Sequence, residues 1–174
     1  MAPLALDHDR DPAVDAHSPW KAAVVRVRAF KRVPIPIEVV WETLADHEGM
    51  STWSPAITVT LEQTGQPDRN GVGAIRRVTG PAVTIREEII GAEAPRWLHY
   101  RALSGLPLRN YRGEVFLTGD AAETAVTWTL MCENRSAVIR FGLDLYANMF
   151  VNALFRAARR RAGAKVKVGS NVRK

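Results

Sequence analysis

The stretch SAVIRFGLDLYANMFVNALFRAARRRA, residues 136–162, decides how the chain folds. It contains no proline, and apolar residues recur along it in steps of three and four, which is the spacing of one helical face. They are Ile139, Leu143, Tyr146, Phe150, Ala153 and Ala157. We predict a helix of about seven turns, with Ser136 as its N-cap and a group of arginines at its negative end. Phe141 and Leu145, beside this face, are apolar too, so the helix needs cover on a broad front.

The rest of the chain alternates between strand-like and turn-like segments that could supply this cover. We expect a first strand over residues 21–32 and two short helices over 37–46 and 48–53. Six further strands are expected over 57–63, 71–79, 82–90, 97–103, 108–118 and 124–132. Because strands and helices do not alternate, the pattern predicts an α+β fold with an antiparallel sheet.

Length and composition indicate one domain with ragged ends. The chain has 174 residues, and we expect a disordered arm over 1–20, a domain over 21–162 and a basic tail over 163–174. A single cysteine, Cys132, excludes an internal disulfide and favours a reducing, cytoplasmic compartment. The four histidines have no metal-ligand spacing, so we expect neither a metal nor a cofactor.

The net charge of +6 is concentrated at the C-terminus. From Arg156 onward there are eight Lys or Arg and no Asp or Glu, and the rest of the chain has a net charge of −2. A helical apolar face followed by arginines suits weak contact with an anionic membrane, and the alternative is a solvated helix end. No aromatic residue interleaves with the basic run, which argues against nucleic acid as a partner.

Six segments, in this order, resemble the START-like helix-grip superfamily (SRPBCC), and within it the polyketide cyclase/dehydrase and lipid-transport branch. They are VPIPIEVVWETLAD (33–46), MSTWSP (50–55), GVGAIRR (71–77), EEIIGAEAPRWLHY (87–100), YRGEVFL (111–117) and TAVTWTL (124–130). The resemblance covers about residues 24–161. It implies a seven-stranded curved sheet that grips the long helix, with a ligand cavity between them. The superfamily holds lipid carriers, hormone receptors and cyclases, so the resemblance alone does not fix a function.

Strand alternation predicts which side chains face the helix. The more apolar set on each strand is Ala74, Arg76, Val78, Val83, Ile85, Glu87, Ile89, Leu98, Tyr100, Ala102, Tyr111, Gly113, Val115, Leu117, Val126, Trp128 and Leu130. With the tightest turns, Tyr100 lies opposite Tyr111, Trp128 lies opposite Gly113, and Arg76 is diagonal to Glu87. A register shift of one residue would expose both Arg76 and Glu87.

The expected interior therefore has apolar walls and four polar groups. The ligand-binding candidates are Arg76, Glu87, Tyr100 and Tyr111, with walls from Ile85, Leu98, Val115, Trp128, Tyr146, Phe150 and Trp53. Each has an alternative: Arg76 and Glu87 as a structural pair, the tyrosines as core residues, and Trp53 as a packing residue instead of a gate at the cavity mouth. Trp97 and His99 are expected on the outer face.

Two functions fit this interior. The first is binding of a hydrophobic small molecule, a lipid or a polyketide-like aromatic. The second is a polyketide cyclase, aromatase or dehydratase, in which Glu87 is the acid or base, Tyr100 or Tyr111 donates to an enolate, and Arg76 anchors an anionic group. No interior histidine is expected, which counts against acid–base catalysis near pH 7. Ligand identity and oligomeric state stay open.

Overall fold

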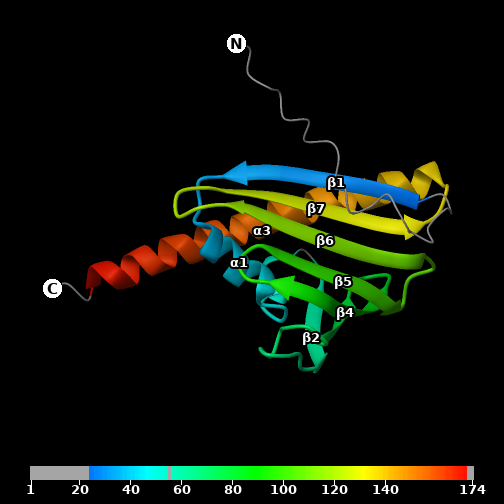
Figure 1. Cartoon of the computed structure of the whole chain (residues 1–174), viewed down its shortest axis with the longest axis horizontal. Helices are drawn as coiled ribbons and strands as arrows, with labels where there is room; N and C mark the ends of the chain where they lie inside the picture. The colour runs from blue at the N-terminus through cyan, green and yellow to red at the C-terminus, as the bar shows by residue number, and fades with distance from the viewer. Residues whose placement is uncertain (1–23, 55, 172–174) are drawn as a thin grey trace, which may run out of the picture.

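The computed structural model describes residues 24–54 and 56–171 and has the expected order of elements. A strand is followed by two short helices, six strands and a long helix (Figure 1). The elements are β1 (Val24–Val33), α1 (Ile37–Ala45), α2 (Met50–Trp53), β2 (Thr58–Gln63), β3 (Ile75–Thr79), β4 (Thr84–Glu93), β5 (Trp97–Ser104), β6 (Arg109–Gly119), β7 (Thr124–Glu133) and α3 (Ala137–Asn171). The arm expected over 1–20 lies outside the described residues.

The seven strands form one antiparallel sheet in the order β1-β7-β6-β5-β4-β3-β2. Each strand from β2 to β7 pairs with its neighbour in sequence, and β1 pairs with β7 along its whole length. The sheet curves, and α3 runs behind it in Figure 1 and projects past its edge at the C-terminal end. This arrangement confirms the α+β class and the seven-stranded sheet.

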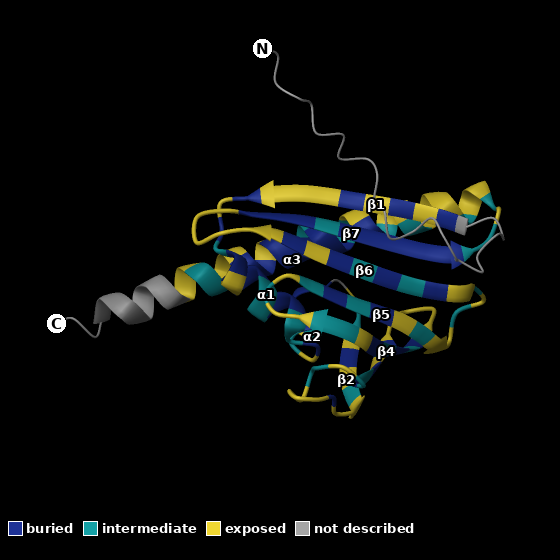
Figure 2. Ribbon diagram, viewed as in Figure 1, coloured by how far each residue is buried: buried dark blue, intermediate teal, exposed yellow. Residues whose placement is uncertain are grey.

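The helix α3 is buried in its middle and exposed in its first turns (Figure 2). Ser136 Oγ accepts a hydrogen bond from Ile139 N at 3.4 Å, which confirms the N-cap. No residue between Ala137 and Tyr146 is buried, whereas Phe150 and Leu154 are fully covered. The helix continues through 163–171 instead of ending near Ala162, although Gly163, a residue type frequent at helix ends, follows directly. None of the described helices is long and apolar enough to cross a membrane.

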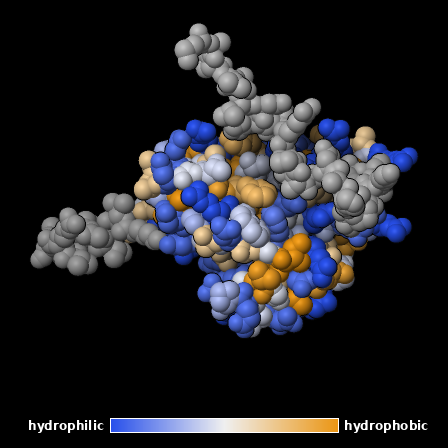
Figure 3. Space-filling view, viewed as in Figure 1, coloured by the Kyte–Doolittle hydropathy of each residue, from blue (hydrophilic) through white to orange (hydrophobic). Residues whose placement is uncertain are grey.

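The outer face of the sheet, turned toward the viewer in Figure 3, mixes hydrophilic side chains with separate apolar patches. Cross-strand ion pairs lie on it, among them Arg101 with Glu88 at 2.7 Å and Arg86 with Glu62 at 2.7 Å. Such exposed pairs contribute about 0–1 kcal/mol each. The stability of the domain therefore comes from the other face, which α1, α2 and α3 cover.

The expected strand pairings are wrong by two residues in each of three hairpins, and the cause is loop length. Loops of four residues, 80–83, 105–108 and 120–123, join strands for which the tightest turns were assumed. Tyr100 therefore lies opposite Gly113 instead of Tyr111, and Trp128 lies opposite Val115. Because the side-chain period of a strand is two, a shift of two keeps every face assignment.

The third hairpin brings Arg76 directly opposite Glu87, where a diagonal contact was expected. The strand expected over 71–79 also begins late, at Ile75, because Gly73 has a φ of +84°, a left-handed conformation that suits a loop glycine.

The close approach of Tyr100 to Gly113 generates a stability prediction. A Cβ atom added at Gly113 would lie 2.1 Å from Cζ of the buried Tyr100 ring, so the ring would have to move. We expect Gly113→Ala to lower the free energy of unfolding by about 1–3 kcal/mol, the usual effect of overpacking a core. Urea denaturation followed by circular dichroism measures this change.

Gly142→Ala is the matched control, because nothing lies within 4 Å of a Cβ atom at this exposed helical position. It should raise the free energy of unfolding by about 0.5–1 kcal/mol. A Gly113→Ala protein as stable as the wild type would contradict the packing of Tyr100 over Gly113.

Candidate functional site

Five polar side chains are buried together on the face of the sheet that the helices cover, and we call them the interior cluster. Arg76, Glu87, Tyr100 and Tyr111 come from the four adjacent strands β3 to β6, and His47 comes from the segment after α1. Arg76 is 4% exposed, Glu87 5% and His47 0%. The alternation of the strands therefore brings all four predicted polar residues to the interior.

Arg76 and Glu87 form an ion pair at the centre of this cluster. Nε and Nη2 of Arg76 approach Oε2 of Glu87 at 2.9 and 2.8 Å. Burial is the largest single effect and works against the charged form of Arg76, but the charge and hydrogen bond of Glu87 together with Tyr100 and Tyr146 outweigh it, so the pKa of Arg76 lies above its ordinary value. Removing one partner from such a buried pair costs about 3–5 kcal/mol, because the other charge is left uncompensated.

Tyr100 connects this ion pair to the apolar wall. The guanidinium carbon of Arg76 lies 4.9 Å from the centre of the Tyr100 ring, a cation–π distance. The hydroxyl of Tyr100 accepts a hydrogen bond from Nε1 of Trp128 at 3.0 Å. Burial, reinforced by Glu87, raises the pKa of Tyr100, and burial raises the pKa of Tyr111 well above its ordinary value. Both hydroxyls therefore stay protonated near neutral pH, where they can donate a hydrogen bond but cannot act as bases.

His47 is the interior residue that the sequence did not reveal, and the expectation of no interior histidine is wrong. Its Nε2 lies 3.0 Å from the carbonyl oxygen of Asn70, and its Nδ1 lies 3.2 Å from Nη1 of Arg76. A carbonyl only accepts, so Nε2 carries the proton and Nδ1 accepts from Arg76. Burial, followed by the charge of Arg76, lowers the pKa of His47 to about 3, so the ring is neutral.

Strand alternation could not have found His47, because it lies in the short segment between α1 and α2, outside any strand. The signal was weak: a lone histidine after the last apolar position of a helix. Its position is set by two partners, Asn70 and Arg76, that lie far along the chain.

Apolar side chains surround the cluster as expected. Ile85, Leu98, Val115, Trp128 and Phe150 are buried in one core. Three more contacts extend this wall along α3 and α2: the ring of Phe150 lies 4.4 Å from Tyr146, 5.7 Å from Trp128 and 6.4 Å from Trp53. The structure thus brings together every predicted ligand-binding residue, and their own side chains occupy much of the interior.

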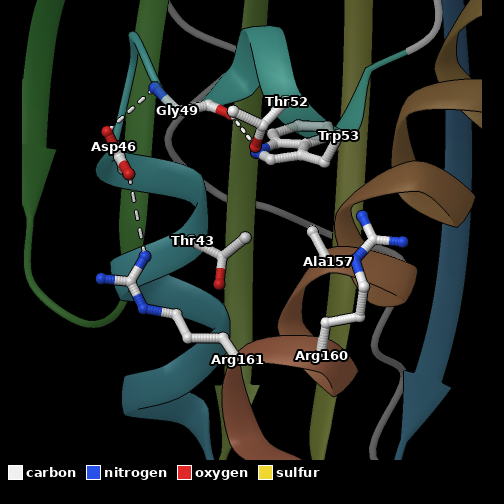
Figure 4. Close-up of a pocket in the computed structure, with 8 residues that line it drawn as sticks. All are labelled: Thr43, Asp46, Gly49, Thr52, Trp53, Ala157, Arg160 and Arg161. Carbon is white, nitrogen blue, oxygen red and sulfur yellow. Dashed lines mark hydrogen bonds and ion pairs between the residues drawn. The ribbon is translucent and has the colours of Figure 1, made fainter. Parts of the chain in front are cut away.

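Two hollows lie at the end of the domain where α1 is. One, of about 640 Å³, lies between α1 and the 66–72 loop and includes Leu98 in its lining. The other, of about 240 Å³, lies between α1, α2 and α3 and includes Trp53 (Figure 4). Neither is lined by Arg76, Glu87, Tyr100 or Tyr111.

The other candidate residues from the sequence lie outside the interior cluster. Trp97 and His99 pack against each other on the outer face as expected, with ring centres 4.5 Å apart. Cys132 is buried and unpaired. Within 24–54 and 56–171, no group of three His, Cys, Asp or Glu side chains is placed to hold a metal ion.

Comparison with protein families and solved structures gives a consistent result. Residues 24–167 match the family described as polyketide cyclase/dehydrase and lipid transport. The Zhui aromatase/cyclase from Streptomyces sp. R1128 has a similar structure, with a TM-score of 0.64 and 22% identity over 80% of this chain and 96% of that one. A START superfamily protein from Mycobacterium smegmatis gives a TM-score of 0.63 at 13% identity, over 80% of this chain and 97% of that one. These likenesses confirm the helix-grip fold.

A third structure is DynU16, a putative protein in the dynemicin biosynthetic locus, with a TM-score of 0.62 and 26% identity. The match covers 76% of this chain and 46% of DynU16, so this chain spans about half the length of that protein. A comparison with curated proteins gave no match.

The neutral state of His47 predicts how stability depends on pH. Its pKa is about 3 in the folded protein and 6.5 in the unfolded chain, so below pH 6.5 only the unfolded chain takes up this proton. Stability from this group is fully present above pH 6.5 and is lost on acidification, by about 1.4 kcal/mol per pH unit. Between pH 7.5 and 5.0 the wild type should lose about 2 kcal/mol more than a His47→Gln variant.

Urea denaturation at both pH values measures the difference. Gly142→Ala, which changes no titratable group, should follow the wild-type pH dependence. Parallel loss of stability by the wild type and His47→Gln would contradict the neutral assignment.

Proposed function

The chain belongs to the polyketide cyclase/dehydrase and lipid transport family, and from this premise we propose that it binds a hydrophobic small molecule between the sheet and α3. The ligand is a lipid or a polyketide-like aromatic, the two classes that the family's description suggests. Arg76, Glu87, Tyr100 and Tyr111 orient it, and the apolar side chains around them supply the contact area.

The observation that carries this proposal is the buried ion pair of Arg76 and Glu87. Charges are expensive to bury, and apolar side chains of similar volume usually stabilise a core as well or better. An ion pair with two protonated tyrosines inside an apolar interior therefore points to a site that needs polar groups. A few convergent polar groups within apolar walls are the usual composition of a small-molecule site.

The first turns of α3 give such a ligand a way in. Ile139, Leu143 and Tyr146 pack against the core but remain partly exposed, so this end of the helix is held less firmly than its middle. A ligand that displaces these turns gains burial in return. Covering about 200 Å² of its apolar surface contributes about 5 kcal/mol, before the cost of association.

Ligand uptake can be measured with the neutral hydrophobic dye N-phenyl-1-naphthylamine, whose fluorescence rises on burial. We expect saturable binding to the wild type. Leu143→Trp adds bulk on the partly buried side of α3 and should weaken binding about tenfold, which corresponds to about 1.4 kcal/mol. Leu145→Trp is the matched control, because Leu145 is 63% exposed on the other side of the helix. Equal affinities of the two variants would contradict an interior site beneath α3.

A second candidate function is catalysis of a cyclisation, aromatisation or dehydration of a poly-β-ketone. Two observations favour it: the structural likeness to an aromatase/cyclase, and the burial of the Glu87 carboxylate in one cluster with two protonated tyrosines. In this reaction Glu87 takes the α-proton, and a protonated tyrosine hydroxyl donates to the enolate oxygen. Arg76 holds Glu87 in place and fixes an anionic group of the substrate.

Glu87→Gln separates binding from catalysis. The molecule that co-purifies with the protein is identified by native mass spectrometry, and product profiles are compared after co-expression with a synthase that makes an unreduced poly-β-ketone chain. A binding protein leaves the profile unchanged, and Glu87→Gln still carries the co-purified molecule. An enzyme alters the profile, and Glu87→Gln abolishes that alteration while the molecule still binds. Because this substitution leaves Arg76 without its carboxylate, circular dichroism must first show that the variant is folded.

A further inference from the structure

The smaller hollow, which we call the helix pocket, has chemistry that the interior site does not use. It lies between three helices, is open to solvent on one side, and is lined by Thr43, Asp46, Gly49, Thr52, Trp53, Ala157, Arg160 and Arg161 (Figure 4). Its volume of about 240 Å³ lies below the range of about 300–1,000 Å³ that is usual for sites of drug-sized ligands. A small group fits this space, and a ring system of polyketide size does not.

Trp53 brings an unpaired hydrogen-bond donor to this pocket. Its side chain is 9% exposed, and its Nε1 is buried without a hydrogen-bond partner among the described residues. An indole N–H can only donate, and a buried donor left unpaired costs about 1–3 kcal/mol. In Figure 4 the nitrogen of the ring is on the side of Thr52 and Gly49. The group that completes this pocket must therefore present an acceptor.

The hydroxyl groups of the pocket do not form a hydrogen bond with that donor. Thr43 donates its hydroxyl proton to the carbonyl oxygen of Val39 at 2.7 Å. Thr52 donates to the carbonyl oxygen of Gly49, also at 2.7 Å. These bonds use the one proton of each hydroxyl and leave its lone pairs able to accept, but neither oxygen is a hydrogen-bond partner of Trp53 Nε1.

The charges of the pocket leave one cation without a partner. Arg161 is paired with Glu42 at 3.3 Å and with Asp46 at 3.8 Å, and Asp46 also accepts from the backbone N–H of Gly49 at 3.0 Å. Arg160 is exposed and has no ion pair among the residues that the structure describes. Figure 4 shows the two guanidinium groups turned in opposite directions, that of Arg161 toward Asp46 and that of Arg160 away from it.

We propose that the helix pocket is a binding site for an oxyanion, a carboxylate or phosphate group that accepts from the indole N–H of Trp53 and pairs with Arg160. The inference goes beyond ligand binding in the interior, and it does not require it. An oxyanion supplies an acceptor for the indole N–H of Trp53 and a negative charge for the guanidinium of Arg160. It comes either as a free ion or as the head group of an amphiphile.

Nuclear magnetic resonance of the full chain labelled with ¹⁵N tests this site, because each of the five tryptophans gives one indole N–H signal. The signal of Trp53 is identified by its loss in Trp53→Phe. Titration with sodium phosphate should shift this signal with saturation, and sodium chloride at the same ionic strength should not. Arg160→Gln should weaken phosphate binding about tenfold, the scale of one charge-assisted hydrogen bond.

Arg159→Gln is the matched control, since Arg159 is adjacent in sequence and exposed like Arg160 but lies outside the pocket lining. It should bind phosphate like the wild type, as read from the same signal. Titrations with acetate and with decanoate distinguish a free ion from the head group of an amphiphile. A shift with phosphate or acetate supports a free ion as occupant, and a shift with decanoate alone supports the head group of an amphiphile. A Trp53 signal that responds to none of these probes, or equal losses in Arg159→Gln and Arg160→Gln, would overturn the proposal.

Discussion

A guanidinium and a carboxylate held out of water organise the interior of this protein. Arg76 and Glu87 face each other across β3 and β4, and the pair is tolerable there only because other groups share its charge. His47 accepts from Arg76, and the ring of Tyr100 lies beneath the same guanidinium. The ion pair thereby fixes a histidine tautomer, a tyrosine ring and the glycine that makes room for it. A substitution at one of these positions therefore disturbs the contacts of the others.

Much of this could be predicted from the sequence, because strand alternation depends only on parity. Arg76, Glu87, Tyr100 and Tyr111 were assigned to the interior although their partners across the strands were wrong, since loops longer by two residues preserve the face. His47 could not be predicted, because it is placed by long-range contacts and not by a local period. The sequence pattern also could not predict which parts of the interior are hollow and which are filled, because that depends on side-chain packing and not on periodicity.

The two sites are joined by aromatic rings. Trp53 lines the helix pocket and meets Phe150 edge to face, and Phe150 in turn contacts Trp128 and Tyr146 on the side of the interior cluster. A hydrogen bond gained or lost by the indole of Trp53 therefore acts on Phe150, a ring of the apolar wall around the interior cluster. Close-packed cores transmit such displacements because they have few voids to absorb them. A polar group in the helix pocket and an apolar ligand in the interior would thus be separated only by the rings of Trp53 and Phe150.

The pairing of β1 with β7 also has a consequence for how the chain is made. The first strand of the domain and its partner are separated by about 100 residues, so β1 leaves the ribosome long before β7 exists. Until then β1 is an unpaired strand with alternating apolar side chains, and the sheet lacks both its closing strand and its helical cover. Folding of this domain therefore waits until β7 and α3 have been made, and until then the open edge can pair with other chains.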